Sequence, residues 1–597
     1  MRRPTSIQGG VARSVLLLLG CTALYLLAAA LTSNSYFLLI MTLVPIWATV
    51  GVSWNIFSGY SGLLSFGHAA FFGIGAYTVA VLFAQYGISP WLGIPLAGVA
   101  GGAAGLLIGL PTFRLRGVYF SLAMLAYPLA MLYVFEWLGL QEIALPLMRE
   151  NPAAYMQFRD YRIYIALAVA LLLTALAINL AIARSRFGLT LLAIKQNELA
   201  AEAAGIDPFR WKLRALVISG AFAGVAGGLY AVVLVVVTPH SVFGMLVSAQ
   251  ALIFTMFGGV GWIAGPVVGA LVLLPLGELF TATLGASLPG IQGVIYGCAI
   301  ILVVLMAPEG VMPWLASRMG GKAAPMPSAS SPSTAMHAAP AAPGPLPAFG
   351  PAGDDLLVVR GLSRRFGGLQ AVQDVTFTVR RHEILGIIGP NGAGKTTMFN
   401  LLNGIIEPSS GSVMFEGREL TGLRPWQVCR LGVGRTFQVV RAFSRLTVLE
   451  NVKIGALTSE PNGALAQQRA LDALALTGMS AQADALAANL PAVQLRLMEV
   501  ARALASRPRL LLLDEVLAGL GKAEVDRVFQ VLVDIKNAGI TIVIIEHTMH
   551  AMVRLADRLL VLDQGKVLYV GQPEAVTSDP TVIEAYLGKK WARHVEN

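Results

Sequence analysis

Apolar stretches long enough to cross a membrane fill the first half of the sequence. A helix needs roughly 20 predominantly apolar residues to span a bilayer core. Charged residues are rare inside these stretches and gather in the short gaps between them. The pattern predicts an N-terminal all-α polytopic membrane bundle of about ten helices. The expected spans cover residues 14–32, 36–58, 66–86, 91–111, 117–138, 162–184, 214–238, 246–262, 264–284 and 290–307.

The charges in the gaps indicate on which side of the membrane each gap lies, because Lys and Arg favour the cytoplasmic side. With the N-terminus inside, the cytoplasmic gaps hold Arg114, six Lys or Arg residues between 184 and 214, and Arg318. The opposite segment, 139–161, carries acidic residues beside its arginines. The bias therefore favours ten spans with both ends in the cytoplasm.

The first span has an alternative interpretation. Arg2, Arg3 and Arg13 followed by an apolar run over 15–31 are also compatible with a cleaved signal peptide. The run is long for a signal peptide, and another apolar stretch follows almost at once. We interpret it as an uncleaved membrane helix.

Glycines recur at every fourth position in several spans, which places each set on one helical face and permits close helix packing. These sets are 101, 105 and 109; 220, 224 and 228; and 261, 265 and 269. Glycines 258–261 and Gly265-Pro266 also suggest a broken or re-entrant stretch. Polar residues inside the spans are candidates for a solute path, with interhelical hydrogen bonding as the alternative role. They are Ser65, His68, Gln250, Thr255 and Glu278.

Composition agrees with a division of the chain into unlike parts. Of 597 residues, 56% are hydrophobic and 13% charged, yet charge is spread evenly from Asp354 onward. The formal net charge of +10 is explained by cytoplasmic loops, and the apolar spans exclude a soluble ATPase acting on nucleic acid. The three cysteines show no metal or disulfide spacing.

Three domains are expected: a membrane domain over 1–313, a linker over 314–353 and a second domain over 354–597. The linker is rich in Ala, Pro and Ser and should be disordered. The cytoplasmic loop 185–213 contains a helix-favouring run, 198–204, that ends at Gly205. We interpret this run as a short helix against which a motor domain pushes; an ordinary amphipathic connection is the alternative.

A phosphate-binding loop opens the second domain. An apolar run over 384–388 predicts a buried strand, and residues 398–402 continue a helix. Between them lies the pattern G-x-x-x-x-G-K-[ST], in which backbone N–H groups surround phosphate oxygens. Lys395 should contact the β and γ phosphates, and Thr396 should bind Mg²⁺. The loop reads Gly389-Pro390-Asn391-Gly392-Ala393-Gly394-Lys395-Thr396-Thr397. This predicts an α/β P-loop NTPase that binds ATP and Mg²⁺.

Other side chains suited to ATP hydrolysis follow the loop. The apolar run 510–513 ends in Asp514, placed to hold the Mg²⁺ shell, and Glu515, placed to polarise the attacking water. A second apolar run ends at His547, which would sense the γ-phosphate. Gln438 is expected beside Mg²⁺ and water, and Phe366 could stack on adenine. In this order after a phosphate loop, the set indicates an ATP hydrolase.

Residues 354–590 resemble an ATP-binding-cassette (ABC) ATPase, specifically that of branched-chain amino acid importers. The resemblance rests on Arg365-Phe366-Gly367-Gly368-Leu369, Gly434-Arg435-Thr436-Phe437-Gln438 and Leu446-Thr447-Val448-Leu449-Glu450-Asn451-Val452. Residues 1–313 resemble the permease of the same systems, through residues 62–77, 114–123 and 258–266.

This resemblance implies a fusion of two normally separate subunits that couples ATP hydrolysis to solute uptake. It implies the bacterial inner membrane as the location, with the ATPase domain in the cytoplasm. The implied partners are a second permease subunit, a second ABC ATPase subunit and a periplasmic substrate-binding protein.

The sequence departs from the ABC pattern at the signature, which usually resembles Leu-Ser-Gly-Gly-Gln. The matching stretch is Leu490-Pro491-Ala492-Val493-Gln494. Val493 stands where a glycine allows close approach to the nucleotide held by the opposite ATPase, so its Cβ should obstruct that contact. Gly521 stands where an Asp or Asn usually links the two sites. We expect an asymmetric pair of sites; tolerance of Val493 through a small backbone shift is the alternative.

The leading hypothesis is an importer of branched-chain amino acids. The alternatives are a nucleotide-binding regulatory membrane subunit or channel with little hydrolysis, and an importer of urea, amides or aromatic acids. An exporter is disfavoured because the permease pattern resembles uptake systems. The sequence leaves open the cargo and whether the chain pairs with itself or with different subunits.

Overall fold

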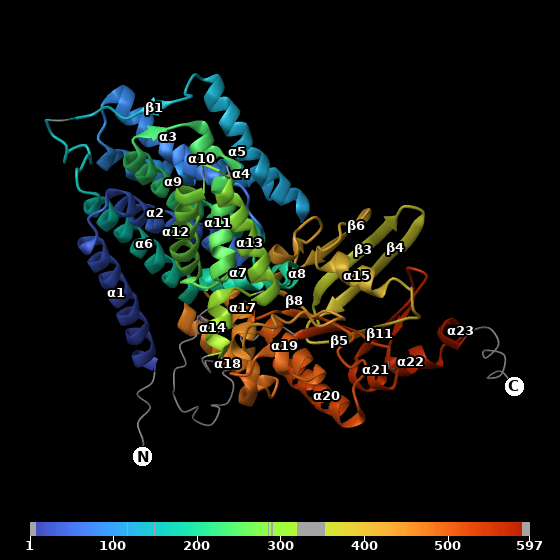
Figure 1. The fold of residues 1–597 in the computed structure, drawn as a ribbon. Coiled ribbons are helices and arrows are strands. Elements are labelled where there is room, and N and C mark those ends of the chain that lie inside the picture. The colour runs from blue at the N-terminus through green and yellow to red at the C-terminus, as the bar shows by residue number, and fades with distance from the viewer. Residues whose placement is uncertain are drawn as a thin grey trace, which may run out of the picture. The chain divides into compact units, whose positions relative to one another are not determined.

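The computed structural model describes residues 7–318 and 353–587, apart from residues 116, 149, 285, 288–289, 308 and 548 (Figure 1). The described chain forms two compact units. The first holds residues 7–195 and 209–318, and the second holds residues 196–208 and 353–587. A short segment of the predicted membrane half therefore belongs to the second unit.

The first unit is a helical bundle. Its apolar helices are α1 (Ile7–Leu31), α2 (Ser35–Trp54), α3 (His68–Tyr86), α4 (Pro90–Thr112), α5 (Val118–Trp137), α6 (Tyr161–Arg184), α9 (Pro208–Leu234), α11 (Met245–Gly258), α12 (Gly265–Leu284) and α13 (Ile291–Met306). Shorter elements are η1 (Asn55–Gly59), β1 (Ile143–Ala144), α7 (Arg186–Gln196), β2 (Val236–Val237), α10 (Pro239–Phe243) and α14 (Val311–Arg318).

The predicted number of membrane helices, about ten, agrees approximately with the structure. In the part of the chain that the structure describes, eight helices are long and apolar enough to cross a membrane. Two shorter apolar segments, Leu19–Leu31 of α1 and Ile291–Val303 of α13, match the first and last predicted spans. Helix α14 continues beyond Trp314, where the linker was expected to begin. Its last turn is stabilised by Arg318 over the Trp314 ring. Residues 319–352 of the expected linker lie outside the described residues.

Helix boundaries differ from the predicted spans near residue 238. Pro239 begins the separate short helix α10, because Thr238 and Ser241 form a capping box there. The glycine cluster at 258–261 forms the turn between α11 and α12. A Cβ on Gly258 would overlap the Gly265 carbonyl, so only glycine permits this tight return.

The predicted glycine faces bring α4 and α9 into close contact. A Cβ on Gly220 would lie 2.6 Å from the carbonyl oxygen of Gly101, and one on Gly101 would lie 3.0 Å from the Cα of Gly224. A Cβ on Gly105 would lie 3.0 Å from the Leu216 carbonyl oxygen. The two backbones therefore approach more closely than any larger residues would allow.

Two of the polar candidates in the spans serve helix packing. The His68 ring lies 3.0 Å from Ser65 Oγ through Nδ1 and 2.8 Å from Ser219 Oγ through Nε2, which joins α3 to α9. Thr255 Oγ1 donates to Gly51 O at 3.1 Å, which joins α11 to α2. These contacts support the hydrogen-bonding role that was left open for them.

The second unit is an α/β domain with two sheets. Its strands are β3 (Asp355–Phe366), β4 (Leu369–Arg380), β5 (Ile384–Ile388), β6 (Ser410–Phe415), β7 (Arg418–Glu419), β8 (Val433–Arg435), β9 (Leu510–Asp514), β10 (Thr541–Ile545), β11 (Arg558–Asp563) and β12 (Lys566–Gly571). Its helices are α8 (Glu198–Ala203), α15 (Lys395–Leu402), α16 (Pro425–Arg430), α17 (Val448–Ser459), α18 (Gly463–Leu476), α19 (Ala492–Ala505), α20 (Lys522–Asn537), α21 (Met549–Leu555), α22 (Pro573–Ser578) and α23 (Pro580–Leu587).

The larger sheet has the order β12-β11-β5-β10-β9-β8 and is parallel except for β12. The smaller sheet, β4-β3-β6-β7, is antiparallel. Strands β5, β9 and β10 are buried along their whole length, as their continuous apolar runs predict. One hydrophobic core joins both sheets to α15 through residues such as Phe377, Phe399 and Val543. The predicted P-loop NTPase architecture is confirmed.

We expect Gly101→Val to destabilise the membrane bundle, because its side chain would force α4 and α9 apart. Overpacking of this kind costs about 1–3 kcal/mol or more. The full-length chain in detergent should lose its monodisperse state at a lower temperature than the unsubstituted protein. Gly293→Val is the control, since a Cβ on Gly293 meets no atom within 4 Å. Equal effects of the two substitutions would contradict the packing role of Gly101.

Candidate functional site

The phosphate loop connects β5 to α15 as predicted. Gly392 and Gly394 have φ values of +83° and +96°, which other residues rarely adopt. A Cβ on Gly394 would also overlap the Ala371 carbonyl oxygen in β4. Glycine is therefore required both by the turn and by the approach of the neighbouring sheet.

The lysine of the loop folds back onto it. Lys395 Nζ donates to the carbonyl oxygens of Gly389 at 2.6 Å and Pro390 at 2.9 Å. Burial lowers the pKa of Lys395, while the negative charges of Glu515 and Asp514 act in the opposite direction. Thr396, in the first turn of α15, is exposed, as are Asn391 and Gly392 of the loop. The accessible side of the loop thus presents Thr396, the predicted Mg²⁺ ligand, whereas the Lys395 side chain is buried.

Three predicted catalytic residues meet beside the larger sheet. Strands β9 and β10 run parallel with Asp514 opposite Ile545, so the residues that follow leave neighbouring strand ends. Glu515 Oε1 lies 2.6 Å from His547 Nε2. Gln438 Nε2 donates to Glu515 Oε2 at 3.0 Å. Residues from three separate parts of the sequence therefore converge on one carboxylate.

The backbone also orients Glu515. Its φ of +51° lies in the left-handed region, which costs a non-glycine residue on the order of 1–3 kcal/mol. Its N–H donates to Ile545 O at 3.0 Å. Arg496 Nη1 donates to the carbonyl oxygens of Glu515 and Val516, each at 3.0 Å. Contacts from β10 and α19 thus compensate for the strained conformation.

Asp514 has properties suited to a metal shell. Its Oδ2 lies 3.7 Å from Arg435 Nη2, whereas its buried Oδ1 has no hydrogen-bond partner among the described residues. Burial raises the pKa of Asp514 to about 6, against the attraction of Arg435. A carboxylate oxygen without a partner fits a hydrated Mg²⁺ ion, for which Thr396 and Gln438 offer neutral oxygen ligands.

Phe366 ends strand β3, and its ring is 40% exposed. The Arg364 guanidinium lies 4.8 Å from the ring centroid. The following strand, β4, contacts the phosphate loop through Ala371. An accessible ring on this hairpin suits the predicted stacking on adenine, and that role stays a prediction.

The altered signature forms the start of helix α19. Pro491 is the N-cap residue and supplies no side-chain hydrogen bond to the first turn. Val493 lies inside this turn and is half-buried. Gly521 is the N-cap of α20, where its N–H donates to Glu524 Oε2 at 2.9 Å. Both departures from the ABC pattern therefore lie at the first turn of a regular helix, the altered signature in α19 and Gly521 in α20.

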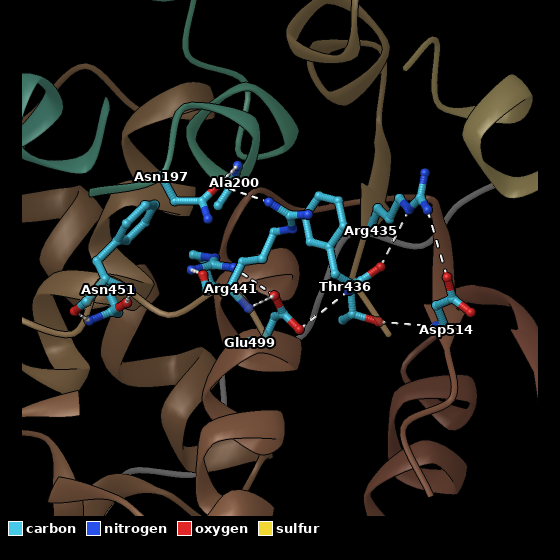
Figure 2. A network of polar contacts seen from close by, with 11 residues as sticks. Asn197, Ala200, Arg435, Thr436, Arg441, Asn451, Glu499 and Asp514 are labelled. Carbon is cyan, nitrogen blue, oxygen red and sulfur yellow. Dashed lines mark hydrogen bonds and ion pairs between the residues drawn. The ribbon is translucent and has the colours of Figure 1, made fainter. Parts of the chain in front are cut away.

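A buried polar network, shown in Figure 2, links α19 to the segment that carries Gln438. Glu499 of α19 accepts hydrogen bonds from the Phe437 N–H at 3.3 Å and the Arg441 N–H at 3.2 Å. Arg502 donates to Glu499 Oε1 at 3.0 Å and to Arg441 O at 2.8 Å. Burial raises the pKa of Glu499, and Arg502 opposes this shift. The pair therefore holds both ends of the segment around Gln438.

Sequence reasoning did not find Arg496, Glu499 or Arg502. They lie on the helix that begins at the signature, and the spacing of three residues between Glu499 and Arg502, which suits an ion pair on a helix, was the available signal. It also did not single out Glu546, which accepts a hydrogen bond from the Leu517 N–H at 2.6 Å. Burial raises the pKa of Glu546 to about 7.

Residues 196–208 complete the second unit. Helix α8 lies where a cytoplasmic helix was predicted, and Gly205 follows it with φ of +83°. Asn197 Oδ1 accepts a hydrogen bond from Arg441 Nη1 at 3.5 Å and caps α8 through the Ala200 N–H at 2.9 Å (Figure 2). Arg441 therefore touches both this segment and the network around Gln438.

The far end of the same segment is also held. Arg430 Nε donates to Gly205 O at 3.2 Å, and Thr458 Oγ1 donates to Ala204 O. Gln196 Oε1 accepts from the Arg445 N–H at 2.9 Å. Both ends of the α8 segment are thus anchored to the ATPase domain.

Comparisons with known families agree with both units. Residues 36–304 match the family described as "Branched-chain amino acid transport system / permease component". Residues 372–518 match the ABC transporter family.

Relatives of known description match the second unit. The chain is 40% identical over 250 residues to the high-affinity branched-chain amino acid transport ATP-binding protein LivG of Salmonella typhimurium, which covers 39% of this chain and 98% of that protein. It is 34% identical to the probable LivG of Archaeoglobus fulgidus, over 39% of this chain and 95% of that protein. An ATP-binding cassette of an ABC transporter, MJ1267, solved in its ADP conformation, is 30% identical, with a TM-score of 0.37, covering 40% of this chain and all of that one.

We expect Glu499→Gln to lower kcat for ATP hydrolysis by about tenfold to a hundredfold, the range that follows from small misplacement of a catalytic group. Loss of the charge weakens the clamp around Gln438 but leaves the phosphate loop intact. ATP affinity should therefore change little. Steady-state hydrolysis and nucleotide-binding titrations of the full-length chain with its partner subunits measure the two effects.

The matched control is Glu416→Gln, because Glu416 pairs with Arg381 at 2.8 Å and with Arg509 away from Gln438. This variant should keep its kcat. A parallel loss of ATP affinity and kcat in Glu499→Gln would mean that the substitution disturbs the domain as a whole.

Proposed function

Because the chain belongs to the ABC transporter family, as a branched-chain amino acid transport permease domain fused to an ABC ATP-binding domain, we propose that it uses ATP hydrolysis to import branched-chain amino acids. The observation that carries this proposal is the convergence of Gln438 and His547 on Glu515 next to the phosphate loop. The two LivG relatives are described as ATP-binding proteins of branched-chain amino acid transport, which supports this cargo over urea, amides or aromatic acids.

In the proposed reaction, the phosphate loop and Lys395 bind the phosphates of ATP. Lys395 exchanges its carbonyl partners for phosphate oxygens, which are stronger acceptors. Glu515 polarises the attacking water, and His547 leaves Glu515 to meet the γ-phosphate. Thr396, Gln438 and Asp514 would hold Mg²⁺, which neutralises charge on the phosphate oxygens. Phe366 would stack on the adenine base.

Hydrolysis is coupled to the membrane half through the α8 segment. The contact between Arg441 and Asn197 connects this segment to the backbone that carries Gln438. Arg430 and Thr458 hold its other end. A shift of Gln438 on nucleotide binding would therefore move α8, and with it the helices on either side of residues 196–208.

The departures at the signature support unequal sites in a pair of cassettes. The site that uses Lys395 of this chain with the signature of a partner ATPase hydrolyses ATP. The site that uses Leu490–Gln494 of this chain binds ATP with little turnover, because Val493 and Pro491 withhold the close backbone contact. This inequality favours pairing with a different ATPase subunit.

The charge bias of the loops supports a location in the bacterial inner membrane with both ends in the cytoplasm, where ATP is available. A second permease subunit would complete the solute path. A periplasmic substrate-binding protein would supply selectivity.

Glu515→Gln should abolish ATP-driven uptake of leucine while nucleotide binding remains. The amide cannot activate water, so we expect kcat to fall by about a hundredfold or more. Uptake and hydrolysis are measured in vesicles that contain the full chain, its partner subunits and the substrate-binding protein. Glu574→Gln on the exposed surface of α22 is the control and should behave as the unsubstituted protein. Unchanged uptake in Glu515→Gln would refute the hydrolytic role.

Val493→Gly should raise ATP turnover by activating the second site. The decisive arm introduces Val493→Gly together with Glu515→Gln, because the first site is then silent. Turnover that reappears in the double variant comes from the site that uses the restored signature. If neither background gains turnover, Val493 is not the obstruction. A third outcome is possible. If the unsubstituted complex hydrolyses only a trace of ATP and Glu515→Gln does not lower that trace, the chain is a nucleotide-binding regulatory subunit.

A further inference from the structure

In the described part of the membrane bundle, one acidic side chain has no cationic partner. Of the ten apolar helices, only α5 and α12 contain an acidic residue. Glu136 is the penultimate residue of α5, and its Oε1 is 3.1 Å from His240 Nε2. Glu278 lies six residues before the end of α12, about 9 Å along the helix axis. Among the described residues, no cationic side chain pairs with it.

The neighbours of Glu278 are neutral and polar. Gln292 Nε2 donates to Glu278 Oε1 at 3.3 Å and to Tyr296 Oη at 3.2 Å. Gln250 of α11 hydrogen-bonds to the Tyr296 side chain. Tyr36 of α2 donates to the Glu278 backbone carbonyl at 3.3 Å. Three helices, α2, α11 and α13, thus bring amides and hydroxyls to the level of Glu278 on α12.

The packing makes room for this cluster. A Cβ on Gly277 would lie 3.0 Å from Tyr296 Oη and 3.2 Å from Gln292 Cγ, so glycine allows α13 to approach α12. The Phe254 ring lies edge-on to Tyr296, with centroids 5.7 Å apart, and forms an apolar wall. Tyr296 and Gln250 are buried, whereas Glu278 is half-buried. Glu278 and Gln292, which is also half-buried, are therefore the accessible members of the cluster.

The proposed orientation places the cluster toward the outside. Helices α2, α11 and α13 begin, and α12 ends, on the side opposite the cytoplasm, and each cluster residue lies near that helix end. This is the side on which a solute enters during import.

We propose that Glu278 with Gln250, Gln292 and Tyr296 recognises a zwitterionic amino acid as it enters the membrane half. This inference rests on the proposed import function. A carboxylate at this depth is unfavourable unless a counter-charge reaches it. The ammonium group of the solute supplies that charge, the amides and hydroxyl suit its carboxylate, and the wall at Phe254 suits an apolar side chain.

The test uses the full chain with its partner subunits in vesicles. L-leucine should protect Glu278 from a membrane-permeant carbodiimide, which modifies buried carboxyl groups. 2-Hydroxyisocaproate, which has the same skeleton with a hydroxyl in place of the ammonium, should not protect it. Mass spectrometry of the peptide that contains Glu278 measures the labelling, and no ATP is needed.

The second arm compares uptake by variants. Glu278→Gln should raise KM for L-leucine by about tenfold or more, the effect of removing a hydrogen bond to a charged group. The KM of Glu278→Asp should lie between those of the unsubstituted protein and Glu278→Gln, because the shorter side chain keeps the charge. Glu136→Gln, the same change at the other membrane acid, should leave KM unaltered.

The outcomes separate the two proposals. Normal leucine uptake by Glu278→Gln, with no protection of Glu278, overturns the recognition site but keeps the import function. Protection by leucine without ATP-driven uptake supports the site and removes the import function. Loss of the partner permease from purified Glu278→Gln would overturn the site, because Glu278 then pairs with a cation of that subunit.

Discussion

Parallel pairing of β9 and β10 is the constraint on which the nucleotide site depends. The register sets Asp514 beside Ile545, so Glu515 and His547 emerge from adjacent strand ends. Strand β5 pairs with β10 in the same direction and brings the phosphate loop to this edge. Because all three strands are buried on both faces, a shift of register would disrupt the packing of their side chains and would draw the Asp514 carboxylate into the apolar sheet. Packing of the sheet thus fixes the relative positions of the phosphate loop, Glu515 and His547.

Helix α19 connects three parts of the ATPase domain: the altered signature, the backbone of Glu515 and the segment that carries Gln438. Its first turn is the altered signature, Arg496 contacts the backbone of Glu515, and Glu499 with Arg502 holds the chain around Gln438. The charged pair is buried, so the loss of either member alone would leave the other as an uncompensated charge. A helix whose signature has lost its glycine therefore keeps a second role in orienting catalytic groups of its own chain. The side chain of Arg441, whose backbone is bound by Glu499 and Arg502, contacts Asn197 and so links this network to the α8 segment.

The membrane bundle is held together differently from the ATPase domain. Its helices pack through close approach of their backbones, whereas α19 is fixed by a buried pair of charges. The glycine faces of α4 and α9 bring carbonyl oxygens within reach of the facing helix, where dispersion contacts stabilise the packing. Its polar groups are mostly satisfied within the bundle, as at His68 and Thr255. Against this background Glu278 stands out, since its contacts in the described part of the chain are with neutral groups.

The spacing of residues along the chain determined the positions of the spans, the phosphate loop and the strand-end residues, because apolar periodicity and glycine-rich turns are local properties. It also predicted the α8 helix, and the glycine faces that pack α4 against α9. The helix boundaries near residues 238 and 314 depended on caps and side-chain stacking at Thr238 and Trp314, which a hydropathy pattern does not contain. Only the tertiary structure revealed that Arg441 joins Asn197 to Gln438's segment, that Glu499 clamps that segment, and that Glu278 has neutral neighbours. These contacts join residues far apart in sequence, and their partners are selected by packing and by burial of charge.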